Sequence, residues 1–247
     1  HGKTTTTSMI TQILYTANID LSAYIGGKLP CIHGSGIAGK SDILVCESCE
    51  FVDTFLKLYP DIAVILNIDA DHLDYFKTVD NIIKSFHKFA ENTTKAIIIN
   101  KDDANSMKSI EGITGKEIIT FGKDSSSDYY PENIRKINGL QSEYTLMHKG
   151  EALGKITLHV AGNHNILNSV AANTFGIFTR NLAEKIPDCI WFPQDESAEY
   201  TDERKYFNFQ QVCDYVCENV SEGDLVITLG CGDAYKIAKM ILKKLKD

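Results

Sequence analysis

Short apolar runs alternate with helix-spaced apolar positions through the first half of the chain. Four runs have the length and side-chain character of buried strands, at residues 43–46, 63–68, 96–99 and 117–121. Residues 79–90 carry apolar side chains at the spacing of an amphipathic helix. Strands that alternate with helices are typical of a parallel sheet covered by helices, so the pattern predicts an α/β fold. We expect residues 43–46 and 63–68 to be neighbouring parallel strands.

The second half of the chain follows a different pattern. Between residues 130 and 161, apolar and polar positions alternate on either side of Lys149-Gly150. This alternation predicts a small antiparallel hairpin appended to the main sheet. A helix is expected to begin near Asn165, and the pattern weakens over residues 185–205. A helix at 209–220, a strand at 225–229 and a Lys-rich last helix predict a second, smaller unit. We therefore divide the chain into domains of residues 1–176 and 177–247.

Charge and hydropathy exclude two classes of partner. The 33 acidic residues outnumber the 25 basic ones, and no basic tract offers a footprint for nucleic acid. No apolar stretch is long enough for membrane insertion, and the first residues do not form a secretory signal, so we expect a cytoplasmic protein. The chain starts at His1 rather than Met, which suggests that the sequence begins inside a longer one.

Seven cysteines raise the question of metal or redox chemistry. Cys46 and Cys49 have the spacing of a metal or redox pair, but no second pair with ligand spacing follows them. We therefore interpret the cysteines as reduced thiols that pack like small apolar residues.

The first four residues match the end of a phosphate-binding loop, G-x-x-x-x-G-K-[ST]. In such a loop the Lys neutralises phosphate oxygens and the hydroxyl binds Mg²⁺, which would assign these roles to Lys3 and Thr4. The following helix would direct its positive end at the nucleotide. Only the last part of the motif is visible, and a Thr-rich helix start explains the same residues about as well.

Two acidic clusters follow predicted strands. Glu47 and Glu50 come directly after residues 43–46, and the string D-A-D-H, which ends at His72, comes directly after residues 63–68. In a parallel sheet, ligands bind beyond the carboxyl ends of the strands, and carboxylates are preferred ligands of Mg²⁺. The clusters therefore indicate a magnesium site, although acids at such positions also cap helices.

Five strings occur in an order that resembles the Mur ligase family, and within it the UDP-N-acetylmuramate–L-alanine ligases. They are H-G-K-T-T-T-T-S-M, E-S-C-E-F-V-D-T-F-L, N-I-D-A-D-H-L-D-Y-F, G-N-H-N-I-L-N at 162–168 and G-D-L-V-I-T-L-G-C-G-D at 223–233. The resemblance implies that residues 1–176 form the family's ATP-binding central domain. It implies that residues 177–247 are part of a Rossmann-like C-terminal domain.

The resemblance also assigns roles to individual residues. It implies catalytic roles for Lys3, Glu50 and His72, and a magnesium environment formed by Thr4, Glu50 and His72, with His72 acting directly, through water or on a second metal. The residues implied in nucleotide binding are His1, Gly2, Lys3, Thr4, Thr5, His164, Asn165 and Asn168.

The implied reaction uses ATP and Mg²⁺ as cofactors and serves peptidoglycan precursor synthesis. ATP would phosphorylate the carboxylate of UDP-N-acetylmuramate, and the amine of L-alanine would attack the resulting acyl phosphate. The sequence departs from the family in two places. The given sequence contains no counterpart of the family's UDP-binding domain, and we find no counterpart of two motifs of the C-terminal domain between Asn173 and Phe207. We therefore expect a truncated copy with impaired catalysis.

Three alternatives remain open from the sequence. The first is another ATP-dependent amide ligase with the same central domain, such as a murein-peptide recycling ligase or a folylpolyglutamate synthase. The second is an inactive nucleotide-binding remnant. The third is a non-enzymatic interaction module, for which the sequence offers no repeat or charged tract.

Overall fold

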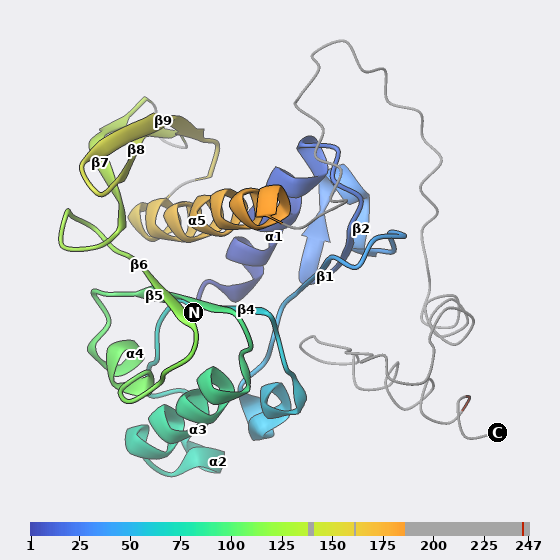
Figure 1. Cartoon of the computed structure of the whole chain (residues 1–247), viewed down its shortest axis with the longest axis vertical. Helices are drawn as coiled ribbons and strands as arrows, with labels where there is room; N and C mark the ends of the chain where they lie inside the picture. The colour runs from blue at the N-terminus through green and yellow to red at the C-terminus, as the bar shows by residue number, and fades with distance from the viewer. Residues whose placement is uncertain (138–140, 161, 186–243, 245–247) are drawn as a thin grey trace.

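A computed structural model describes residues 1–137, 141–160, 162–185 and 244 of the chain (Figure 1). Its strands form two sheets, one of three strands in the order β2-β1-β3 and one of six in the order β4-β5-β6-β7-β8-β9. The smaller sheet consists of β1 (Ser22–Leu29), β2 (Gly34–Ile37) and β3 (Leu44–Cys46). The larger consists of β4 (Ile62–Ile65), β5 (Ala96–Asn100), β6 (Glu117–Phe121), β7 (Tyr129–Lys136), β8 (Ser142–His148) and β9 (Glu151–Leu158). The helices are α1 (Lys3–Thr16), η1 (Pro30–Ile32), η2 (Phe51–Lys57), α2 (Leu73–Phe76), α3 (Val79–Asn92), α4 (Ala104–Ser109) and α5 (Asn163–Lys185).

Strands β4, β5 and β6 form a parallel core that is covered on both faces. Ile97, Ile98 and Ile99 of β5 are fully buried, as expected where helices cover both sides of a sheet. Ile98 packs in a cluster with Val170 of α5, whereas its two neighbours pack in a cluster with Ile82 of α3. The prediction of a parallel, helix-covered α/β fold is confirmed.

Helices α1 and α5 lie side by side against the sheets (Figure 1). Ile10 and Leu14 of α1 share a buried cluster with Ala172 of α5 and with strands β1 and β3. On the opposite face lies α3. Its N-cap residue is Thr78, whose side chain accepts a hydrogen bond from the backbone N–H of Asn81. Strand β4 is therefore packed between α5 on one face of the sheet and α3 on the other.

The predicted hairpin is confirmed and is part of a larger antiparallel extension. Strands β8 and β9 pair antiparallel around Lys149 and Gly150, which take φ values of 49° and 90°, and β7 adds a third strand. A single residue pair, Phe121 with Tyr129, joins this extension to β6. The fully buried Tyr144 of β8 hydrogen-bonds Ser169 of α5 through its hydroxyl at 2.8 Å.

One prediction about strand order is wrong. Residues 43–46 and 63–68 are not neighbouring strands, because β3 pairs in parallel with β1 and β4 pairs in parallel with β5. Strand β1 had not been predicted, since its centre is Gly26-Gly27 rather than an apolar run. The second run is also shorter than expected, because β4 ends at Ile65 and residues 66–68 continue in irregular backbone.

The predicted second domain falls almost wholly outside the described residues. The helix at 209–220, the strand at 225–229 and the final helix remain predictions, as does the boundary at residue 176, through which α5 continues. Within the described ranges, no helix is long and apolar enough to cross a membrane.

Candidate functional site

The N-terminal end of α1 forms the centre of the site. Gly2 is the N-cap residue with a left-handed φ of 84°, and no side chain caps the helix. A Cβ atom on Gly2 would lie 2.6 Å from Oδ1 of Asn168, so only glycine allows α5 to approach this closely. The first backbone N–H groups of a 14-residue helix therefore start beside α5, where the helix dipole favours an anion.

Lys3 and Glu50 form an ion pair at this helix end. The Lys3 ammonium donates to Glu50 Oε1 at 3.0 Å and lies 2.9 Å from Oε2. Burial by itself raises the pKa of the Glu50 carboxyl, but the hydrogen bond and positive charge of Lys3 outweigh it, so the pKa lies below its ordinary value. Glu50 is therefore ionised at neutral pH, as a cation ligand must be.

Thr4 contacts Glu47 rather than Glu50. Its hydroxyl donates to Glu47 Oε1 at 2.8 Å, and the backbone N–H of Gly26 donates to Glu47 Oε2 at 2.7 Å. Glu47 is only 2% exposed. The sequence placed Glu47 in an acidic cluster, but the family resemblance assigned a metal role only to Glu50. No local sequence pattern singles out Glu47, because its contact with β1 depends on the close approach of Gly26, where a Cβ would lie 2.7 Å from Glu47 Oε2.

His72 approaches Glu50 from the segment that follows β4. Its Nε2 lies 3.8 Å from Glu50 Oε1, and its ring centroid lies 4.8 Å from that of Phe51. His72 has a left-handed φ of 54° and caps the short helix α2. We expected Glu50 and His72 to lie near Lys3 and Thr4; the structure brings Glu50 to Lys3 and His72 to Glu50, whereas Thr4 bonds Glu47. The roles of these residues remain predictions.

His1 lies on the same edge, close to the loop after β4. Its α-amino group donates to Asn67 Oδ1 at 2.7 Å, and Asn67 donates back to the His1 carbonyl at 2.9 Å. The His1 ring lies 3.3 Å from Asp71 and 3.7 Å from Asp69. Thr5 is half-buried on α1, one position beyond Thr4.

The three residues of α5 that the resemblance implies in nucleotide binding fall into two groups. Asn165 and Asn168 are both buried, and Asn168 donates to Asn165 at 3.0 Å while its other end approaches Gly2. These two residues therefore lie at the N-terminal end of α1. His164 is exposed, and its ring lies against Gly162, so the structure does not bring it to the other site residues.

The donor atoms of the site fit a magnesium ion. Thr4, Glu47 and Glu50 supply a hydroxyl and two carboxylates, and Mg²⁺ prefers hard oxygen ligands. Among the described residues, no group of three or more His, Cys, Asp or Glu side chains is arranged to hold a metal. Mg²⁺ bound with nucleotide takes several of its ligands from phosphate and water, so a small set of protein oxygens suffices.

Comparison with known proteins identifies the family. A sequence model of the Mur ligase middle domain matches residues 1–176. This chain belongs to the Mur ligase family. The match contains all the residues of the site described above, from Gly2 to Asn168.

Several curated relatives of this Mur ligase chain carry the same name. The UDP-N-acetylmuramate–L-alanine ligase of Caldanaerobacter subterraneus subsp. tengcongensis is 43% identical over 174 residues, which are 70% of this chain and 38% of the relative. The enzyme of the same name from Clostridium acetobutylicum is 42% identical over 174 residues, with the same two coverages. The chain thus spans about two fifths of the length of these relatives.

Solved structures agree on the fold of this Mur ligase chain. The UDP-N-acetylmuramate-alanine ligase of Thermotoga maritima superposes with a TM-score of 0.63 at 21% identity, covering 100% of this chain and 63% of that one. The MurF ligase of Thermotoga maritima, solved in complex with ADP, gives a TM-score of 0.56 at 16% identity, covering 100% of this chain and 77% of that one.

Proposed function

We propose that this chain is the ATP- and Mg²⁺-binding part of a ligase that joins L-alanine to the carboxylate of UDP-N-acetylmuramate. In this reaction ATP phosphorylates the carboxylate to an acyl phosphate, and the amine of L-alanine displaces the phosphate. The reaction belongs to peptidoglycan precursor synthesis, and the proposal includes the cytoplasmic location expected from the sequence.

One observation carries the proposal. Lys3 and Glu50, which are 47 positions apart in sequence, meet at the N-terminal end of α1, and Thr4 meets Glu47 one residue further on. Identities of 43% and 42% to proteins named UDP-N-acetylmuramate–L-alanine ligases support the pair of substrates.

Different residues of the site would contact the phosphates and the cation of a bound nucleotide. The ammonium of Lys3 would neutralise phosphate oxygens at the positive end of α1, in place of part of its ion pair with Glu50. Bound Mg²⁺ would supply further positive charge at the transferring phosphate. Because the Thr4 hydroxyl donates its proton to Glu47, the lone pairs of its oxygen remain available to a cation. Glu50 and His72 would border the same position from the loops after β3 and β4.

The proposal is tested by nucleotide binding to the Lys3→Met variant. This variant removes the charge from the Lys3 side chain but keeps a similar length. Hydrogen bonds to charged groups contribute about 1.5–3 kcal/mol, so ATP affinity measured by calorimetry should fall by about 10- to 100-fold. Thr4→Val should instead remove most of the enhancement of ATP binding by Mg²⁺.

The matched control is Lys108→Met on α4. Lys108 is an exposed lysine on a helix, and α4 contributes Met107 to the cluster on the other face of the sheet. ATP affinity should not change in this variant. Equal affinities for the parent chain and Lys3→Met would refute the proposed site.

A further inference from the structure

Two segments that carry site residues contact each other at three successive levels. The first runs from Glu50 to Asp53 and the second from His72 to Tyr75. At one end Glu50 lies 3.8 Å from His72. In the middle, the Phe51 ring lies 4.8 Å from the His72 ring and 6.3 Å from the Tyr75 ring. At the other end the Tyr75 hydroxyl donates to Asp53 Oδ2 at 2.7 Å.

The backbone of both segments is held in a costly conformation. Val52, Asp53 and His72 each take a left-handed φ of 54°, a region that non-glycine residues rarely occupy. Such residues persist only where surrounding contacts hold them in place. The side-chain contacts of Asp53 with Tyr75 and Ser85 therefore help to hold this backbone in place.

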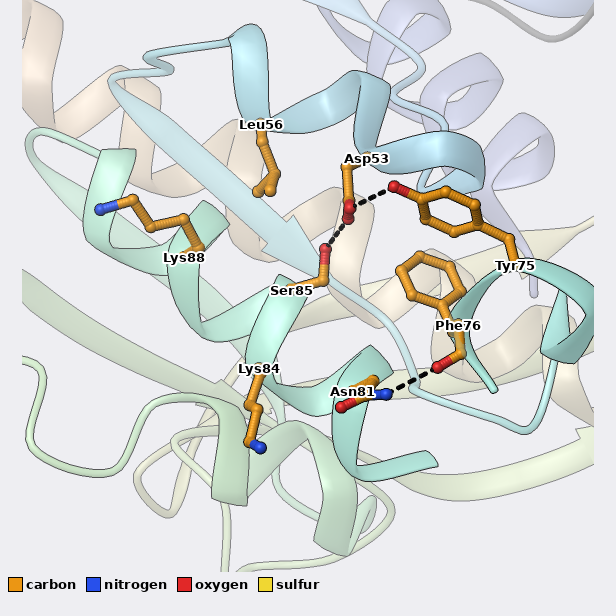
Figure 2. Close-up of a pocket in the computed structure, with 8 residues that line it drawn as sticks. All are labelled: Asp53, Leu56, Tyr75, Phe76, Asn81, Lys84, Ser85 and Lys88. Carbon is orange, nitrogen blue, oxygen red and sulfur yellow. Dashed lines mark hydrogen bonds between the residues drawn. The ribbon is translucent and has the colours of Figure 1, made fainter. Parts of the chain in front are cut away.

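Both carboxylate oxygens of Asp53 are engaged, each by a different helix (Figure 2). Oδ2 accepts from Tyr75 of α2, and Oδ1 accepts from Ser85 of α3. The bond to Asp53 raises the pKa of the Tyr75 hydroxyl, so this group remains a donor at neutral pH. These side chains border a pocket of about 360 Å³, into which Leu56 and Phe76 also project (Figure 2).

Ser85 connects this arrangement to the rigid part of the fold. It is buried on α3, a helix whose Ile82 and Phe89 pack into two of the hydrophobic clusters. Asp53 thus links a strained loop to a helix fixed by the core, and the Tyr75 bond extends that link to the segment of His72.

We propose that Asp53, together with Tyr75 and Ser85, is a positioning residue that sets the separation of Glu50 and His72 for cation binding. This inference rests on the proposed function, since it assumes that a divalent cation binds beside Glu50. Asp53 does not touch the cation and acts through the two segments that it joins. Groups that hydrogen-bond a metal ligand directly change metal affinity by about 10- to 100-fold when removed, and Asp53, whose side chain bonds Tyr75 and Ser85 instead, should act at the lower end of this range.

The decisive variant is Tyr75→Phe in the 247-residue chain. It deletes one hydroxyl and keeps the ring beside Phe51. Mn²⁺ serves as the probe, because electron paramagnetic resonance reports its free concentration directly. The affinity for Mn²⁺ is measured with saturating ADP, and the affinity for ADP alone is measured in excess EDTA. The matched control is Tyr59→Phe, since Tyr59 is 56% exposed and lies outside these contacts.

The expected result separates positioning from general stability. Tyr75→Phe should weaken Mn²⁺ binding by about tenfold and leave ADP binding in EDTA unchanged. Ser85→Ala should act in the same direction, and Tyr59→Phe should have no effect. In a Glu50→Gln background, Tyr75→Phe should cause little further loss, because the residue through which it acts has already been altered.

Other outcomes overturn the inference in distinguishable ways. If Glu50→Gln weakens Mn²⁺ binding and Tyr75→Phe does not, the positioning role is wrong and the proposed function stands. If Tyr75→Phe weakens ADP binding in EDTA to the same extent, Asp53 is only structural. If the parent chain binds no Mn²⁺ with ADP, or if Glu50→Gln has no effect, the proposed cation site itself fails.

Discussion

Strand β5 and the edge formed by the segments after β3 and β4 follow opposite rules. In β5, Ile97, Ile98 and Ile99 are fully buried, and the strand is paired in parallel on both sides. At the edge, Glu47 and Glu50 are buried charged groups, and three non-glycine residues of the adjoining loops have left-handed backbone. The sheet is a regular scaffold whose stability allows its edge to hold strained backbone and buried charge. The following predictions test this division.

The largest expected effect is the absence of ligase activity from the 247-residue polypeptide. A polypeptide of these 247 residues should show no alanine-dependent ATP turnover with UDP-N-acetylmuramate, because it matches only 38% of the length of its relatives. Positioning of reactants can supply about 7–11 kcal/mol of barrier reduction, and the site proposed among the described residues holds only nucleotide and cation. A coupled phosphate-release assay measures this, and turnover at about 1–10³ per second would contradict it.

The scaffold should be sensitive to lost volume. Ile98→Ala removes a fully buried side chain between two helical layers and should lower the free energy of unfolding by about 2–5 kcal/mol. Urea denaturation measures the change. Leu153→Ala on β9 is the control, because this leucine is 45% exposed and its loss should cost less than about 0.5 kcal/mol. Similar costs at both positions would show that β5 is not the rigid core inferred here.

The ion pair at the edge should give a pH-dependent contribution to stability. The pKa of Glu50 in the fold is lowered from 4.5, so its contribution is complete above about pH 4.5 and is lost as the pH falls through the lowered value. Lys3 is partly exposed, so the contribution should be only about 1 kcal/mol. The difference in unfolding free energy between the parent chain and Glu50→Gln should therefore shrink between about pH 7 and pH 3.

The control for this titration is Glu111→Gln. Glu111 is exposed, so the difference between this variant and the parent chain should be small at every pH. A difference for Glu50→Gln that stays constant down to the acid limit would show that the ion pair contributes nothing to stability.

The smallest effect should have the opposite sign. Val52→Gly replaces a β-branched residue at a φ of 54° by the residue that adopts this conformation most readily. Val52 is 47% exposed, so little apolar contact is lost. We expect a gain of about 0.5–1 kcal/mol in the free energy of unfolding, measured by urea denaturation. A loss larger than that at the exposed Leu153 would place Val52 with the packed scaffold instead of the strained edge.

The parts of the fold that the sequence predicted are those in which one residue pattern determines one element. The isoleucines of β5 and the helical spacing of α3 were sufficient by themselves. The order of the strands was predicted wrongly, because apolar runs do not reveal that the glycine-containing β1 lies against β3. The proximity of Glu50 and His72 was nevertheless predicted correctly, since both follow strands at their carboxyl ends.

The remaining features depend on packing that no local pattern encodes. That Thr4 bonds Glu47 follows from the close approach of β1 at Gly26, and that Asn168 meets Gly2 follows from the packing of α5 on α1. Asp53 and Tyr75 lie in two of the strings quoted above, but those strings do not indicate that the two side chains bond each other or that Ser85 of α3 joins them.

The long sequence separations within the site also bear on how the chain folds. Lys3 and Glu50 are 47 positions apart, and His1 and Asn67 are 66 apart, whereas the cap of α3 joins residues only three apart. Closing long loops costs entropy before any contact forms, so such contacts form late in folding. Helical circular dichroism should therefore recover before nucleotide binding when the denatured chain is returned to native conditions. The return of the proposed nucleotide binding would then report the time at which the last step of folding is complete.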